Sequence, residues 1–158
     1  MLKPRSATSW LAAGLLAGVW SAPIAAQTVT DCESYVASAQ LIAEPWADNS
    51  ATYAEGAIRV AVMDTVEPAA GAFHLMVLSP PYDEGGFRGC HLVSETTGIG
   101  FGGLKLQGVE PAYDAAKGLT LRLPASFWQP DADTYVDGVL VVTINQQSGA
   151  ITAVAERP

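Results

Sequence analysis

The sequence predicts a mainly β protein: a curved antiparallel meander of about seven strands with one N-terminal helix, rolled toward a partly open barrel. Two observations support this fold class. Apolar and polar residues alternate with a period of two in most segments after residue 57. No helical pattern of about ten residues separates any two of these segments, as parallel crossovers would require. A two-sheet β-sandwich and an α+β arrangement are the alternatives.

The first 26 residues have the features of a secretory signal peptide. Two cations open the segment, residues 10–20 form an uncharged apolar run, and small residues lead to Ala26, after which we expect cleavage. The run is shorter than the roughly 20 residues that a helix needs to cross a bilayer. We therefore expect a periplasmic or secreted protein with a single domain over residues 27–158 and no membrane span in the mature chain.

The chain is acidic, with 16 Asp and Glu residues against 8 Lys and Arg and a formal net charge of −8. Such a charge repels phosphate backbones and anionic lipids, which argues against nucleic acids and membrane surfaces as partners. The remaining partner classes are another protein and a small molecule.

The first element expected after the signal is a helix over residues 31–43, ended by Pro45. It is predicted by apolar residues with the i, i+3, i+4, i+7 spacing at Cys32, Tyr35, Val36 and Ala39. Cys32 and Cys90 are the two cysteines of the chain. In an exported protein such a pair predicts a structural disulfide, which stabilises the fold by about 4 kcal/mol in the chain-entropy model.

The strands follow in order, each bounded by residues that favour turns. We expect them over residues 58–63, 73–79, 87–94, 99–107, 119–123, 139–145 and 150–154. Residues 124–137 are expected to form the longest irregular stretch. If the second and third strands pair with Met76 opposite Cys90, then His74 lies opposite Leu92, and the disulfide holds the helix over this face of the sheet. His91 then points away from the helix, to the surface.

The two histidines raise the hypothesis of a hydrolase or metal-dependent enzyme that uses His74 or His91, because imidazole serves as a metal ligand and general base. However, the expected register places them on opposite faces, and the sequence has no HExxH, GxSxG or SxxK motif. The acidic stretch over residues 131–137 lacks the glycine and final glutamate of a calcium loop. We therefore predict no catalytic residue, no metal site and no cofactor.

The glycine-rich segment over residues 98–103, GIGFGG, lacks the helix and the lysine that a phosphate-binding loop needs. It predicts a bulge, or the close approach of a neighbouring aromatic ring to the backbone. The candidate ligand-binding residues are aromatic: Trp46, Tyr82, Trp128 and Tyr135. We expect them in loops or at strand ends, where rings can form a flat surface for a sugar or a peptide. The interpretation that we favour, however, is that these rings plug the open end of the sheet, because large aromatic side chains are mostly buried in folded proteins.

Five segments carry a resemblance to known sequences: YAEGAIRVAVMDT, HLMVLSPP, FRGCHLVSETTGIGFGGL, YDAAKGLTL and VTINQQSGAIT. Together they resemble a group of small exported bacterial proteins of unknown function. The resemblance implies a single exported domain with a cysteine at position 90, and it carries no catalytic residue.

These observations favour a non-enzymatic exported protein that binds a partner or contributes to the cell envelope. An acidic inhibitor of a basic exported enzyme is the alternative, because the chain is acidic and the loop over residues 79–86 is suited to enter a cleft.

Overall fold

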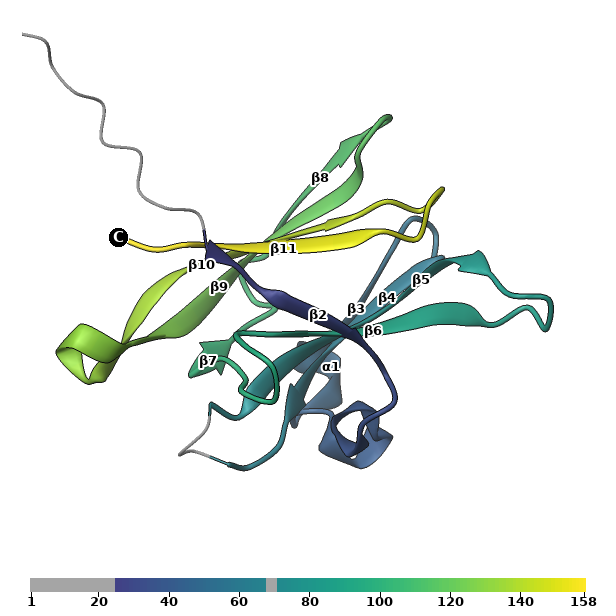
Figure 1. Ribbon diagram of the computed structural model, residues 1–158. Helices are drawn as coiled ribbons and strands as arrows, with labels where there is room; N and C mark the ends of the chain where they lie inside the picture. Colours follow the sequence, from purple (N-terminus) through teal and green to yellow (C-terminus); the bar gives the residue numbers. More distant parts are fainter. Residues whose placement is uncertain (1–24, 68–70) are drawn as a thin grey trace, which may run out of the picture.

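The computed structural model describes residues 25–67 and 71–158, which form two antiparallel sheets packed face to face (Figure 1). Sheet A contains, in spatial order, β1 (Ala25–Ala26), β11 (Ile151–Glu156), β10 (Thr134–Ile144), β9 (Gly118–Gln129) and β7 (Gly103–Leu104), and β8 (Glu110–Asp114) pairs with another part of β9. Sheet B contains β2 (Thr28–Asp31), β6 (Arg88–Ser94), β5 (Phe73–Tyr82), β4 (Ile58–Asp64) and β3 (Ser50–Tyr53). Apart from its last two residues, the signal peptide expected over residues 1–26 lies outside the described residues.

The mainly β class is confirmed, and the arrangement is the two-sheet sandwich that was the alternative prediction. The strands do not form one curved meander, because both sheets have an apolar face. Leu121 and Leu123 of β9 belong to the same buried cluster as Val77 of β5 and Val93 of β6. Packing these two faces against each other removes more apolar surface from water than one curved sheet would.

The helix expected over residues 31–43 is not formed. Asp31 ends β2, and the following residues form two 3-10 turns, η1 (Tyr35–Ala37) and η2 (Ala39–Leu41), before the short helix α1 (Trp46–Asn49). No helix within the described residues is long and apolar enough to cross a membrane.

Each of the two turns follows a serine, a residue that is poorly suited to helix interiors. Ser34 and Ser38 precede η1 and η2 in extended backbone conformation, and neither side chain makes a capping hydrogen bond. Residues 32–43, which we call the N-terminal cover, still pack on the outer face of sheet B, as expected of the helix. The apolar contacts join Val36, Ala37, Leu41 and Ile42 of the cover to Ala61, Met63 and Leu92 of the sheet.

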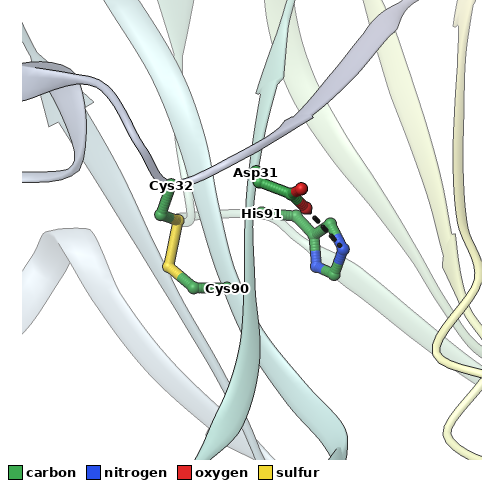
Figure 2. Close-up of a disulfide and its surroundings, with 4 residues drawn as sticks. All are labelled: Asp31, Cys32, Cys90 and His91. Atoms are coloured by element: carbon green, nitrogen blue, oxygen red, sulfur yellow. Dashed lines mark ion pairs between the residues drawn. A yellow bond between two sulfur atoms is a disulfide. The ribbon is translucent and has the colours of Figure 1, made fainter.

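The disulfide between Cys32 and Cys90 is confirmed, and it fastens the start of the N-terminal cover to β6 (Figure 2). The pairing of β5 with β6 differs by two residues from the prediction, because Met76 lies opposite Leu92, and Leu78 opposite Cys90. The ladder is irregular at the two prolines between Ser79 and Tyr82, which have no N–H to donate. A shift by two residues leaves every side chain on its predicted face.

Residues 124–137, expected to be irregular, are mostly strand. β9 and β10 extend into this stretch and leave the 3-10 turn η3 (Pro130–Ala132) between them. The Pro124 carbonyl accepts a hydrogen bond from the Lys105 N–H at 3.1 Å, on the side of the short strand β7. Since N–H and C=O of one residue point to the same side in an antiparallel ladder, the missing N–H of Pro124 costs no bond to β10.

The strand expected over residues 99–107 is much shorter, because only β7 is paired regularly. Phe101 just before it is fully buried and forms an isolated bridge with Phe73. The segment bends at its glycines, in keeping with their predicted role. The short strands β2, β3 and β8 were not expected.

Candidate functional site

Two of the four candidate aromatic residues lie side by side on the outer face of sheet A. Trp128 on β9 pairs with Tyr135 on β10, and their ring centroids are 5.2 Å apart with ring planes at 66°. These residues keep 36% and 37% of their surface exposed. The two rings therefore form an accessible corner instead of the expected flat surface.

The other two candidates lie elsewhere in the fold. Trp46 begins α1, beside the edge strand β3 of sheet B. Tyr82 ends β5, where the Arg88 guanidinium lies 5.4 Å from the centre of the ring. The four predicted residues thus do not form one site, and only the Trp128 and Tyr135 pair is a shared surface.

A polar cluster continues from this pair along the same two strands. Ser126 and Asp137 form the next cross-strand pair on the outer face, and the Ser126 hydroxyl donates a hydrogen bond to the Asp137 carboxylate at 2.7 Å. Together with the exposed residue Lys105, they line a hollow of about 200 Å³. The donor and the acceptor thereby lie one outward position along the strands from the two rings, and the cation lies one position further, beside Pro124.

Two glycines form the backbone beside this cluster. Gly103 lies opposite Ser126 on β9, and a Cβ atom at Gly102 would overlap the ring of Tyr135. The ring therefore rests directly on the backbone, which is the close approach predicted for the glycine-rich segment. Gly102 and Tyr135 do not line the first hollow but border a second one, of about 460 Å³, which is lined mainly by apolar residues such as Phe73. The name aromatic groove is used below for Gly102, Gly103, Lys105, Ser126, Trp128, Tyr135 and Asp137.

An ion pair between the buried carboxylate of Glu95 and the half-buried Arg157 holds the backbone of Trp128 in place. The Glu95 carboxylate accepts the Trp128 N–H at 3.1 Å and a hydrogen bond from Arg157 at 3.0 Å. Arg157 also donates to the Trp128 carbonyl and lies 4.9 Å from the centre of the Phe127 ring. Burial raises the pKa of Glu95, while the Trp128 N–H and Arg157 act in the opposite direction. Both backbone polar groups of Trp128 are thus fixed, so the aromatic corner is preorganised.

His74, one of the two residues proposed for an enzyme, is buried and pairs with Ser94. This residue is 4% exposed, and its Nδ1 lies 2.8 Å from the hydroxyl of Ser94, which is also buried. Burial lowers the pKa of His74. Gly100 lies close to the ring, since a Cβ atom there would be 2.9 Å from Nε2. The Ser94 hydroxyl thus occupies Nδ1 of His74 inside the fold.

His91 points away from the disulfide face, as predicted, but the expected surface position is wrong. It lies opposite the core residue Val77 on the inner face of sheet B, and its side chain is only 24% exposed, because sheet A packs on that side. Its Nε2 is 3.5 Å from the carboxylate of Asp31, its cross-strand partner on β2 (Figure 2). The two histidines therefore lie on opposite faces of sheet B. In the part of the chain that the structure describes, no three His, Cys, Asp or Glu side chains are grouped to hold a metal ion.

The sequence reasoning missed Lys105, Ser126 and Asp137. Ser126 and Trp128 continue the alternation of Leu121 and Leu123, which would place them on the outer face of β9 once that strand is extended past Pro124. Lys105 had no comparable signal, because β7 reaches β9 through tertiary pairing alone.

The aromatic groove presents an exposed aromatic corner next to an acceptor, a hydroxyl and a cation, on strands whose backbone is fixed. Such an arrangement is suited to a ligand that has both apolar faces and polar groups. Comparisons with protein-family models, with curated proteins and with solved structures find no match for this chain.

Proposed function

We propose that this chain is a non-enzymatic exported protein that binds a component of the cell envelope in the aromatic groove. The observation that carries the proposal is the exposed pair of Trp128 and Tyr135, whose backbone is held by the buried contact of Glu95 with Arg157. Preorganised rings next to exposed polar side chains are typical of binding sites.

Export is supported by the N-terminal sequence and by the disulfide. The signal features over residues 1–26 and the bond between Cys32 and Cys90 agree with an oxidising compartment outside the cytoplasm. The resemblance to small exported bacterial proteins points the same way. Protein recovered from the periplasm or medium is expected to have the mass of a chain that begins at Gln27.

The binding proposal is tested by NMR on the mature chain labelled with ¹⁵N. Addition of solubilised cell-envelope extract is expected to shift or broaden the amide signals of the aromatic groove. Tyr135→Ala should remove this effect, whereas Tyr113→Ala, at a side chain that is 69% exposed on β8, should leave it unchanged. Perturbations that are absent, or that lie on the other loops, would refute a ligand site in the groove.

An acidic inhibitor is the second candidate, favoured by the hairpin between β5 and β6, which projects from the sandwich (Figure 1). Its tip carries Asp83 and Glu84 next to Phe87, which is 73% exposed. Asp83 accepts hydrogen bonds from the N–H groups of Gly85 and Phe87, so the loop has a defined shape. A basic enzyme inhibited by this chain at low salt should lose the inhibition with Phe87→Ala, whereas Tyr135→Ala should retain it.

A further inference from the structure

We infer that the ligand of the aromatic groove is a neutral oligosaccharide, an inference that rests on the proposed function. Four properties of the groove favour this chemical class: the corner formed by its rings, the spacing of its polar side chains, the hydrogen bonds that its backbone N–H groups already make within the sheet, and its charge. Each property excludes a different competing class of ligand.

The aromatic corner matches the shape of a sugar ring. A pyranose has faces of C–H groups, which carry slight positive charge and pack on the negative face of an aromatic ring. Trp128 and Tyr135 meet at 66°, so one ring can support a face of the sugar while the other borders its edge. A flat apolar ligand would bury no more apolar surface in this corner than in a simple hollow.

The polar side chains lie at the distance of a neighbouring sugar hydroxyl or a second sugar unit. Successive outward residues on a strand are about 6.6 Å apart, so Ser126 and Asp137 lie one such step from the rings. The Asp137 carboxylate has about four acceptor sites, and the described residues occupy one of its oxygens, through Ser126. Ser126 keeps its acceptor capacity, and Lys105 adds ammonium donors. Such a mixture of donors and acceptors matches the hydroxyl groups of a sugar. A purely apolar ligand would remove these polar groups from water without offering them hydrogen bonds, which costs free energy.

Two backbone N–H groups of the groove are already hydrogen-bonded within sheet A, which argues against an extended peptide that would pair with them. Peptides that add to a sheet need free N–H and C=O groups at its edge. Here the Gly102 N–H donates to the Ser126 carbonyl at 2.8 Å, and the Lys105 N–H donates to the Pro124 carbonyl at 3.1 Å. Recognition in the groove therefore depends on side chains, as it does for a sugar.

Charge selects neutral sugars over acidic ones. Asp137 lies inside the groove, Asp64 lines the adjoining hollow, and the chain as a whole has a net charge of −8. One lysine, Lys105, does not offset this potential, so uronic acid or sulfated chains are repelled. A neutral hexose or N-acetylhexosamine chain meets no such penalty.

The test uses the fluorescence of Trp128. Trp46 and Trp128 are the two tryptophans after residue 26, so Trp46→Phe in the mature chain leaves Trp128 as the sole reporter. The probes are hexasaccharides of β-linked glucose, α-linked glucose and β-linked N-acetylglucosamine, with oligogalacturonate as the anionic comparison. At least one neutral probe is expected to shift the Trp128 emission in a saturable way, and oligogalacturonate is expected not to.

Matched variants decide whether binding occurs through the groove. Asp137→Ala and Tyr135→Ala should each weaken binding of the active probe about tenfold or more. Tyr113→Ala lies outside the groove, so this variant should bind within about twofold of the parent. Circular dichroism of each variant checks that it is folded.

Two results would overturn the inference. One is that no neutral probe binds at concentrations up to about 10 mM, the range of weak protein–ligand affinity; the other is that binding is unaffected by Asp137→Ala and Tyr135→Ala. If the sugars fail while envelope extract still perturbs the groove by NMR, the carbohydrate inference is wrong and the proposed function stands. If the extract perturbs nothing in the groove, the proposed function itself is wrong.

Discussion

The two outer faces of the sandwich differ in what covers them. The outer face of sheet B is apolar at Ala61, Met63 and Leu92, and the N-terminal cover lies over it, fastened by the disulfide. The outer face of sheet A is polar, with Arg122, Ser126 and Asp137, and carries the exposed aromatic corner. The two cysteines thus lie on the covered face, whose packing stabilises the fold, while the face proposed to bind a ligand carries no sequence motif.

The difference follows from the physical chemistry of the two faces. An apolar outer face must be shielded from water, and a short irregular segment with few internal hydrogen bonds needs a covalent tie to remain there. A polar outer face with ion pairs is stable in water and remains free for a ligand. Substitutions on the covered face should therefore affect stability, and substitutions on the open face should affect binding.

The largest effect is expected from removing the disulfide. Cys32→Ser with Cys90→Ser releases a loop with a sequence separation of 58, and the free energy of unfolding should fall by about 4 kcal/mol. Urea unfolding of the double variant and of the parent measures the difference, and a reducing agent should destabilise only the parent. Free thiols in the denatured, unreduced parent would show that the bond is not formed.

The next largest effect is expected beneath the N-terminal cover. Met63 is fully buried there, and Met63→Ala should lower the free energy of unfolding by about 3 kcal/mol because it leaves a cavity. Val141→Ala, at a partly exposed position on the outer face of sheet A, is the matched control and should cost about 0.5 kcal/mol. Equal losses for the two variants in urea unfolding would contradict the distinction between the faces.

A smaller, pH-dependent effect is expected from His74, on the covered face. Burial lowers its pKa below the usual 6.5, so between the two pKa values the unfolded chain binds more protons than the folded one. Stability is complete above pH 6.5 and is lost as the pH falls toward the pKa of the folded state. His74→Gln should flatten the dependence of the urea midpoint on pH in this window. A His74 ring that titrates at or above 6.5 in NMR would show that the sign is wrong.

Much of the fold could be predicted, because its signals are local. The alternation of apolar and polar residues in β4 and β9 identified strands. The pair Cys32 and Cys90 identified the covered face, even though the segment between Ser34 and Ser38 forms a 3-10 turn instead of an α-helix. The division into two sheets could not be predicted from these signals. The alternating pattern of β9 is the same whether its apolar face packs inside one curved sheet or against a second sheet.

The candidate site was predicted only in part, for a related reason. Trp128 and Tyr135 were selected because they are aromatic, but their pairing depends on the extension of β9 and β10 through residues 124–137. Lys105 joins them through the contact of β7 with β9, which no local pattern encodes. The buried contact of Glu95 with Arg157 joins two residues that are 62 positions apart.

The smallest effect is expected from the ion pair on the open face. Arg122 donates two hydrogen bonds to Glu156, at 2.8 and 2.7 Å, which lowers the pKa of Glu156. A carboxyl with a lowered pKa stabilises the fold above its unfolded pKa, and this contribution is lost as the pH falls through the folded pKa. Both side chains are well exposed, so the effect on stability should be small and screened by salt. In NMR titrations of the carboxyl carbons, Arg122→Ala should raise the pKa of Glu156, while the urea midpoint at neutral pH and high salt stays that of the parent. If this substitution destabilised the protein as strongly as Met63→Ala, the open face would also be part of what holds the fold together.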